Sequence, residues 1–289
     1  MRPRHLTPVT RVALLANEKS GSKRSAEELE RLLTENGATV RTFPIGEMEQ
    51  AATWRPDRFA VAGGDGSIAP VAATAGAAGA PLALIPSGTA NDFARGMGIS
   101  DDPEEACRLA ATGARERTME LGHMDHRPFV NVASAGLAVN AARRALPFKK
   151  ALGPFAYVVG ALDAGVRAAP VECRLERDGE RIFEGRAWQV IVSSTGRFGA
   201  GSSVREADPS DGQLDVTVIE ARSRHRLVRH AYGLRTGRIV EQDGVHHTRA
   251  LRLELHVPAD TAYNVDGEIL THGSARFSAE HAAFRLIVP

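Results

Sequence analysis

The stretch Phe59-Ala60-Val61-Ala62-Gly63-Gly64-Asp65-Gly66-Ser67 decides the fold that this sequence predicts. Its apolar residues 59–62 indicate a buried strand that runs directly into the glycines, and a helix is expected from about 68 to 78. Glycines let a backbone approach a bulky anion closely, and the following helix presents free N–H groups to a phosphate. A carboxylate beside a phosphate requires a cation between them, so Asp65 indicates Mg²⁺. The alternative is an ordinary strand-to-helix turn with a surface aspartate.

A second loop of the same design follows the next expected strand, residues 81–85. It is Pro86-Ser87-Gly88-Thr89-Ala90-Asn91-Asp92-Phe93-Ala94-Arg95. In a parallel sheet both loops emerge at the carboxyl ends of their strands, where ligands bind. We expect Thr89 to hydrogen-bond a phosphate and Arg95 to pair with one. The alternatives are an N-cap role for Asn91 or Asp92 and a solvated Arg95.

Strands and helices alternate through the first half of the chain, which predicts a mostly parallel sheet flanked by helices. Further strands are expected at 11–16 and 39–43, and helices at 25–36 (with a capping box of Ser25 and Glu28), 48–54, about 92–95 and from Asp102 onward. From about residue 120 short strands indicate an antiparallel β domain. They are expected at 129–133, 171–177, 186–193, 213–219, 251–256 and 262–266, with helices near 153–167 and 223–236. A final apolar strand at 284–288 has no sheet assigned by the sequence.

Composition excludes several classes of protein. The 289 residues are 43% hydrophobic, which is too many for intrinsic disorder, and the formal net charge of +1 argues against broad electrostatic binding of nucleic acid. Cys107 and Cys173 are too few for a disulfide framework or a zinc site, which suggests a reducing compartment. Residues 66–91 carry no charge, but they are rich in Ala and Gly and contain prolines, unlike a membrane span. The N-terminal apolar stretch is too short for a signal peptide, so a soluble, cytoplasmic protein is expected.

An ordered set of motifs gives the sequence a specific resemblance. Besides the two loops it includes Asn17-Glu18-Lys19-Ser20-Gly21, Glu120-Leu121-Gly122, the segment 129–136, Gly153-Pro154-Phe155-Ala156-Tyr157, Asp208-Pro209-Ser210-Asp211-Gly212 and Asn264-Val265-Asp266-Gly267-Glu268. This set resembles the diacylglycerol kinase catalytic family, which includes bacterial lipid kinases and, more distantly, sphingosine kinases. The resemblance covers nearly the whole chain.

The resemblance implies a two-domain lipid kinase fold with the active site between the domains. An α/β nucleotide-binding domain would span 1–120, with 276–289 returning to it, and a mainly antiparallel, β-sandwich-like lipid-substrate domain would span 121–275. The family transfers the γ-phosphoryl group of ATP to a lipid hydroxyl, with ATP and Mg²⁺ as cofactors. The nucleotide-binding residues would be Asn17, Ser20, Gly21, Gly63, Gly64, Gly66, Ser67, Gly88, Thr89, Asn91 and Arg95.

Two further roles are implied by the same resemblance. Glu268 would be the general base that takes the proton of the lipid hydroxyl, with Asp65 assisting catalysis through an active-site Mg²⁺. A structural Mg²⁺ would be bound by the Asp211 side chain and the backbone carbonyls of Asp208 and Gln213. From the residues alone, both Asp-Gly segments are also ordinary turn signals.

Several positions depart from the family pattern. They are Glu18, Ser22, Ser67, Ala69-Pro70 and Glu120, which stand where proline, a basic residue, threonine, Asn-Glu and aspartate are usual. The last two motivate an alternative, a catalytically silent nucleotide- or lipid-binding regulator. A second alternative is a kinase of a soluble substrate, because NAD kinases share the Gly-Gly-Asp-Gly loop, although they lack the loop at 86–93 and the Asp-Gly-Glu motif.

Residues 222–238 form a strongly basic segment without an acidic residue. Its apolar residues Leu227, Val228, Ala231, Tyr232 and Leu234 are expected on one face of a helix. Such a helix can rest on anionic lipid, which predicts peripheral association with a membrane that carries the lipid substrate. The alternative is a core-packed helix with a solvated basic face. No nucleic-acid partner is expected, and the sequence is compatible with a homodimer.

Overall fold

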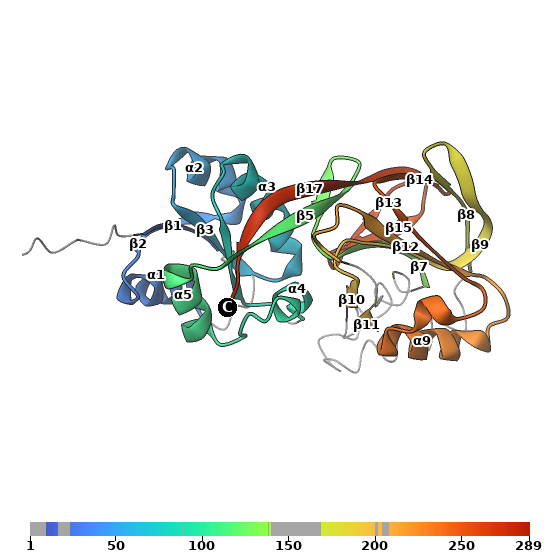
Figure 1. Cartoon of the computed structure of the whole chain (residues 1–289), viewed down its shortest axis with the longest axis horizontal. Coiled ribbons are helices and arrows are strands. Elements are labelled where there is room, and N and C mark those ends of the chain that lie inside the picture. Colours follow the sequence, from blue (N-terminus) through green and yellow to red (C-terminus); the bar gives the residue numbers. More distant parts are fainter. Residues whose placement is uncertain are drawn as a thin grey trace, which may run out of the picture. The chain divides into compact units, whose positions relative to one another are not determined.

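The computed structural model describes residues 10–16, 24–88, 90–137, 139, 169–199, 202–203 and 208–289 (Figure 1). The chain divides into two compact units. Unit 1 is Met1–Met119 with Ala282–Pro289, and unit 2 is Glu120–His281. The strand β17 (Ala275–Ile287) begins in unit 2 and ends in unit 1.

Unit 1 is built on a parallel sheet. Its strands are β1 (Arg11–Ala16), β2 (Thr39–Pro44), β3 (Arg58–Gly63) and β4 (Leu82–Pro86), in the order β2-β1-β3-β4. The end of β17 adds a further parallel strand, with Leu286 beside Leu82. The apolar run at 284–288, whose sheet the sequence left open, therefore belongs to this sheet.

Helices follow the strands of unit 1 in alternation. They are α1 (Ala26–Glu35), a short 3₁₀ turn at Ile45–Glu47, α2 (Met48–Thr53), α3 (Asp65–Ala77), α4 (Asp92–Gly96) and α5 (Pro103–Thr112). The capping box predicted for α1 is present, because Glu28 N donates to Ser25 Oγ and Ser25 N donates to Glu28 Oε2. Leu29, Leu32 and Leu33 of α1 are buried against the sheet.

The charge-free residues 66–91 form α3 and β4. Every residue of β4 is buried, and Ile68, Val71 and Ala72 are among the buried residues of α3. Their lack of charge follows from this burial, because an unpaired charge is costly in an apolar interior. Helix α3 begins at Asp65, three residues earlier than expected, so Asp65 and Gly66 lie in its first turn.

Unit 2 is mainly antiparallel. Its strands are β5 (Glu116–Met124, from unit 1), β6 (Arg127–Phe129), β7 (Val132–Gly136), β8 (Val171–Arg177), β9 (Glu180–Ser193), β10 (Arg197–Gly199), β11 (Ser202–Ser203), β12 (Leu214–Glu220), β13 (Val245–Ala250), β14 (Arg252–His256), β15 (Ala262–Val265) and β16 (Glu268–Thr271). The order is β16-β15-β7-β9-β8-β14-β17, with β12 between β9 and β13. The long strand β9 pairs with β8 in its first part and with β7 and β12 in its last part. This change of partner is consistent with the expected sandwich-like β domain.

Two apolar clusters support unit 2. The larger includes Phe129, Tyr263 and Phe277, which are almost fully buried between the strands. The smaller joins Trp188, Ile219 and Ile239 to helix α9 (Arg226–Thr236) and a following 3₁₀ turn at Ile239–Glu241. The predicted fold class, an α/β unit plus a mainly antiparallel β unit, is confirmed.

Several local predictions for unit 2 differ from the structure. The strand expected at 129–133 is interrupted at Val130-Asn131, β9 is longer than expected, and β5, β13 and β16 were not predicted. The helix expected near 153–167 lies outside the described residues. In α9, Leu227 and Leu234 pack on the small cluster, whereas Val228 and Tyr232 are exposed, so the apolar residues do not share one face. Within the described part of the chain, no helix is long and apolar enough to cross a membrane.

Candidate functional site

The two glycine-rich loops of unit 1 touch each other. They follow β3 and β4, which are neighbouring parallel strands with Gly63 beside Pro86, and Ser87 N donates to the carbonyl of Gly63 over 3.1 Å. A Cβ atom added to Gly88 would lie 2.6 Å from the Cα of Gly64, so only glycine fits at this contact. The sequence prediction that both loops lie at one edge of the sheet agrees with this geometry.

The first loop is shaped by Gly63 and by the start of α3. A Cβ atom on Gly63 would lie 2.8 Å from both Cβ and Oγ of Ser67, so the serine occupies the space that a larger residue would need. The N-cap of α3 is Gly64, and no side-chain hydrogen bond caps this helix. The N–H of Ser67 donates to the carbonyl of Gly64 over 2.9 Å, whereas no residue that the structure describes accepts a bond from the N–H groups of Asp65 and Gly66. Free N–H groups at the start of a helix are the arrangement that binds anions.

Asp65 connects the two loops. Its Oδ2 accepts the N–H of Asp92 over 3.1 Å, and its Oδ1 accepts the N–H of Phe93 over 3.0 Å. Asp65 thus caps the N-terminus of α4, although it comes from the first turn of α3. The sequence indicated this aspartate as a cation ligand and did not predict the cap.

Asn91 holds the second loop in its turn. It has a positive φ of 51°, its Oδ1 accepts the N–H of Gly88, and its Nδ2 donates to the carbonyl of Gly88 and to Asp101. Asn91 therefore closes the turn instead of capping α4 with its side chain. Asn91 thus occupies the N-cap position of α4, as the alternative expected, but its side chain makes no cap hydrogen bond.

Arg95 makes an ion pair within unit 1. Its Nε and Nη2 both donate to Asp101 Oδ2, at 3.0 and 2.8 Å, and its side chain is 53% exposed. The hydrogen bond and charge of Asp101 raise the pKa of Arg95. Pairing with a phosphate would require this side chain to turn from Asp101 or to share it. Gly66, in the first turn of α3, is exposed. The other predicted nucleotide-binding residues, Asn17, Ser20, Gly21 and Thr89, lie outside the described residues.

Glu120 lies in unit 2 and is hydrogen-bonded to the turn that carries Asp208 and Asp211. It is buried, its Oε1 accepts the hydroxyl of Ser194 over 3.0 Å, and its Oε2 accepts the N–H of Gly212 over 2.7 Å. Its own N–H donates to the carbonyl of Pro209. Burial raises the pKa of Glu120 to about 7, and the charges of Asp211 and Asp208 act in the same direction. Glu120, a departure from the family pattern, therefore holds the turn at 208–213.

The expected metal ligands lie in that turn. Asp211 Oδ1 accepts the N–H of Gln213 over 2.9 Å, and its Oδ2 is 3.5 Å from Nη1 of Arg249. Asp208 Oδ1 accepts both the N–H and the hydroxyl of Ser210. The Asp211 carboxylate is half-buried, and the carbonyl of Asp208 accepts the N–H of Asp211 over 3.3 Å, so the turn carries hard oxygen donors of the kind that Mg²⁺ prefers.

Asp266 is a site residue that the sequence prediction missed. Its buried carboxylate accepts three backbone N–H groups, those of Val130 (2.7 Å), Asn131 (3.0 Å) and Val132 (2.9 Å). These bonds explain why the strand expected at 129–133 is interrupted. The sequence offered one signal for this contact, because the segments 129–136 and 264–268 are both among the family motifs. The motifs do not reveal that the two segments meet in the fold.

Glu268 follows the turn that Asp266 starts. Asp266 and Gly267 both have positive φ angles, 46° and 91°, and connect β15 to β16. Glu268 is the first residue of β16, its side chain is 62% exposed, and its Oε2 pairs with Arg127. The structure therefore places Glu268 on a rigid hairpin with an accessible carboxylate, and its catalytic role stays a prediction.

Comparison with known proteins decides the family. Residues 11–124 match the family described as "Diacylglycerol kinase catalytic domain", and residues 131–288 match the "YegS C-terminal NAD kinase beta sandwich-like domain". A curated relative named diacylglycerol kinase, from Mycobacterium tuberculosis (strain CDC 1551 / Oshkosh), is 30% identical over 240 residues, which cover 81% of this chain and 77% of the relative. The chain belongs to the diacylglycerol kinase family.

Further relatives of this diacylglycerol kinase family member agree. A protein named diacylglycerol kinase from Staphylococcus aureus (strain bovine RF122 / ET3-1) is 28% identical over 262 residues, which cover 89% of this chain and 79% of the relative. A crystal structure of a diacylglycerol kinase from Bacillus anthracis str. Sterne matches with a TM-score of 0.77 at 19% identity, over 98% of each chain. An NAD kinase from Archaeoglobus fulgidus in complex with ATP matches with a TM-score of 0.55 at 13% identity, over 96% of this chain and 93% of that one. These structures show the shared fold, and the named relatives imply a kinase.

Proposed function

We propose that this protein is an ATP-dependent lipid kinase that transfers the γ-phosphoryl group to the hydroxyl of diacylglycerol or a related lipid alcohol. The observation that carries the proposal is the contact of Gly64 with Gly88 beside the uncapped start of α3. Close glycine backbones and free helix N–H groups suit the phosphates of a nucleotide. Catalysis of phosphoryl transfer rests mainly on such positioning and on electrostatics.

Glu268 is the proposed general base. A lipid alcohol is a weak nucleophile until a base takes its proton, and a carboxylate within hydrogen-bond reach can do so. The Asp266 carboxylate fixes the hairpin that carries Glu268, because it binds three N–H groups of the neighbouring segment. Arg127 pairs with one carboxylate oxygen of Glu268 and orients the side chain.

Mg²⁺ fits two places in this proposal. Each carboxylate oxygen can accept a second bond, so Asp65 can bind a cation while it caps α4. At the turn of unit 2, the Asp211 carboxylate and the backbone carbonyls of Asp208 and Gln213 are hard donors that suit Mg²⁺. Mg²⁺ would supply charge neutralisation for the nucleotide at the first place and would stabilise the turn at the second.

The test is transfer of radiolabelled phosphate from ATP to diacylglycerol in mixed micelles, with a panel of lipid alcohols and NAD as further acceptors. We expect transfer to a lipid and loss of at least a hundredfold in Glu268→Gln. Glu184→Gln is the matched control, because Glu184 is also an exposed glutamate paired with an arginine, and it should retain activity.

Other outcomes would replace the proposal. Phosphorylation of NAD without lipid turnover would favour the soluble-substrate alternative. ATP binding without transfer to any acceptor would favour the silent regulator. Equal activity of Glu268→Gln and the wild type on every acceptor would remove Glu268 from the mechanism.

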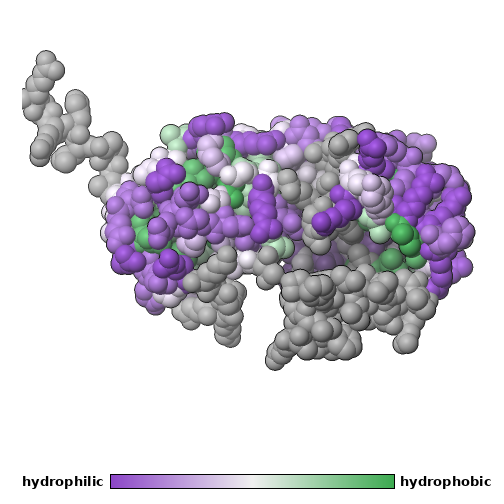
Figure 2. All heavy atoms as spheres, turned by 90° about the horizontal axis from the view of Figure 1, so that it is seen from below, coloured by the Kyte–Doolittle hydropathy of each residue, from purple (hydrophilic) through white to green (hydrophobic). Residues whose placement is uncertain are grey.

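A surface of α9 supports peripheral association with anionic lipid. Val228 and Tyr232, one helical turn apart, are 78% and 69% exposed, and Arg229 and Arg235 are exposed beside them. Among the coloured residues on the face that Figure 2 shows, hydrophobic ones form small patches between hydrophilic ones. Apolar side chains that enter a bilayer surface, flanked by arginines, suit a membrane with anionic headgroups.

The membrane proposal is tested by co-sedimentation with vesicles. Wild type should bind phosphatidylglycerol vesicles and bind phosphatidylcholine vesicles less. The double variant Val228→Ser/Tyr232→Ser should lose most of this binding. Leu251→Ser, which changes another exposed apolar residue of unit 2, should not. Equal binding of all three proteins would contradict a role for α9.

A further inference from the structure

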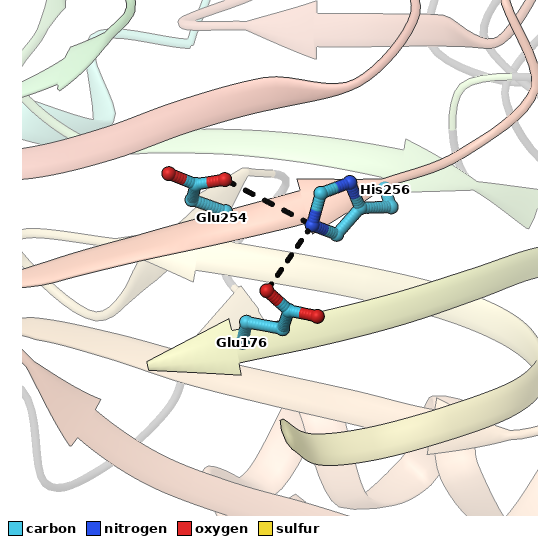
Figure 3. Close-up of side chains that lie close together, drawn as sticks. All are labelled: Glu176, Glu254 and His256. Atoms are coloured by element: carbon cyan, nitrogen blue, oxygen red, sulfur yellow. Dashed lines mark ion pairs between the residues drawn. The ribbon is translucent and has the colours of Figure 1, made fainter. Parts of the chain in front are cut away.

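Three side chains with metal-binding groups meet on the sheet of unit 2 (Figure 3). Glu254 and His256 are two residues apart on β14, so they project from the same face of the strand. Glu176 is the register partner of Glu254 on the neighbouring strand β8. One carboxylate oxygen of each glutamate and the imidazole Nε2 lie within 4.8 Å of one another. None of the three residues belongs to the sites described above.

The distances in this cluster suit a shared ion better than direct hydrogen bonds. Nε2 of His256 is 3.5 Å from Oε2 of Glu176 and 3.9 Å from Oε2 of Glu254. N–H···O hydrogen bonds span about 2.7–3.2 Å. Two ligands of a tetrahedral Zn²⁺, each bound at about 2.0–2.1 Å, lie roughly 3.3 Å apart. Small side-chain rotations would therefore bring all three atoms to the distances of a zinc site.

The imidazole nitrogen adds a further observation. The His256 side chain is 32% exposed, but its atom Nε2 is buried and, in the described part of the chain, makes no hydrogen bond, only the two longer ion-pair contacts to the glutamates. A buried polar atom without a partner is costly, and native proteins rarely leave one unexplained. Nε2 faces the two glutamates in Figure 3, and in the tautomer that leaves its lone pair free it would coordinate a cation bound between them.

The two glutamates of the cluster carry like charges that are only partly used by neighbouring arginines. Glu176 and Glu254 are directly opposite each other on neighbouring strands, and like charges in that position destabilise a sheet. Each glutamate pairs through Oε1 with an arginine, Glu176 with Arg174 (2.9 Å) and Glu254 with Arg276 (3.1 Å). These pairs leave Oε2 of both glutamates facing His256, and they hold the carboxylates in the orientation a metal requires.

We propose that Glu176, Glu254 and His256 form a binding site for a divalent transition-metal ion, with Zn²⁺ as the best match. The mixed nitrogen and oxygen donors suit Zn²⁺, and water completes the coordination. The ion links β8 to β14 and stabilises unit 2. The nearby arginines reduce its affinity, so exchangeable binding at micromolar concentration is expected rather than a permanently bound ion.

The proposal is tested with the untagged full-length protein after removal of metals. Zn²⁺ binding is measured by competition with a chromophoric chelator, and Co²⁺ serves as a spectroscopic probe of tetrahedral geometry. Wild type should bind Zn²⁺ at this site with micromolar affinity, and its thermal midpoint should rise with Zn²⁺ concentration. His256→Ala and Glu176→Gln should weaken binding at least tenfold and abolish the Zn²⁺-dependent rise in the midpoint.

His246→Ala provides the matched control. His246 Nε2 is also 3.5 Å from one glutamate, Glu220, but it is not part of a three-ligand cluster in the described residues. This variant should bind Zn²⁺ as the wild type does. Circular dichroism without metal verifies that each variant is folded, and Glu176→Gln preserves side-chain size if His256→Ala does not fold. Zn²⁺ affinity unchanged in both cluster variants, or no micromolar binding by wild type, would overturn the proposal.

Discussion

The glycine-loop edge of unit 1, residues 63–67 and 86–88, and the Asp266 turn of unit 2 use backbone N–H groups in opposite ways. In unit 1 no described side chain caps the N–H groups at the start of α3, and Gly64 and Gly88 let the two loops touch beside them. In unit 2 the N–H groups of residues 130–132 are occupied by the protein's own carboxylate, Asp266. N–H groups that are left open can bind a ligand, which is the role proposed for unit 1, and they stabilise the fold where the chain supplies the anion.

Replacing Asp266 should cause the largest loss of stability, because it removes the anion that the chain itself supplies to the N–H groups of unit 2. Asp266→Ala leaves three buried N–H groups without an acceptor, so we expect the free energy of unfolding of unit 2 to fall by about 4 kcal/mol. The chain has two tryptophans, Trp54 in unit 1 and Trp188 in unit 2. Urea unfolding followed by fluorescence in a Trp54→Phe background therefore reports on unit 2.

Asp266→Asn is the control for this prediction. Asparagine tolerates the positive φ and keeps one oxygen acceptor, so it should lose less stability than alanine. If Asp266→Ala unfolds within about 1 kcal/mol of the wild type, the three hydrogen bonds do not stabilise the turn as described.

Forcing apart the two glycine-rich loops of unit 1 should have the next largest effect. The new Cβ of Gly88→Ala would lie 2.6 Å from Gly64 Cα and 2.8 Å from Asn91 Oδ1, which forces the two loops apart. We expect ATP affinity, measured by titration calorimetry, to fall at least tenfold, or about 1.4 kcal/mol. Gly46→Ala has open space around the new Cβ and should bind ATP normally. Unchanged affinity in Gly88→Ala would remove the loop contact from the nucleotide site.

The smallest effect is expected at Asp65. Asp65→Asn keeps one oxygen acceptor but loses the charge that faces the start of α4, so the stability of unit 1 should fall by about 1 kcal/mol. Trp54 fluorescence in a Trp188→Phe background measures this change. Asp102→Asn is the matched control, because Asp102 caps α5 in the same unit. If Asp65 also binds Mg²⁺, only Asp65→Asn should raise the Mg²⁺ concentration needed for activity.

Local signals in the sequence predicted most of unit 1. The apolar run 11–16 gave β1 with its observed bounds, and Ser25 with Glu28 gave the start of α1, because both depend on neighbouring residues only. The glycines indicated the two loops for the same reason. The cap that Asp65 provides was missed, because its partners follow the next strand of the sheet.

The features that sequence reasoning missed depend on contacts between distant segments. Asp266 binds N–H groups of residues more than a hundred positions earlier, which no local pattern reveals. Strand β13, Val-His-His-Thr-Arg-Ala, is polar and forms through its pairing with the buried strand β12. In α9, helical spacing alone could not show that Leu227 would be packed and Val228 exposed.

The path of β17 has a consequence for synthesis of the protein on the ribosome. Leu286 lies beside Leu82 in the sheet of unit 1, yet all of unit 2 is translated between them. At about 5–20 residues per second, the sheet of unit 1 must wait roughly ten to forty seconds for its last strand. During that interval β4 exposes an unpaired apolar edge on the nascent chain. Unit 1 is therefore synthesised first but completed last, and it is the unit that would need protection by chaperones while unit 2 is made.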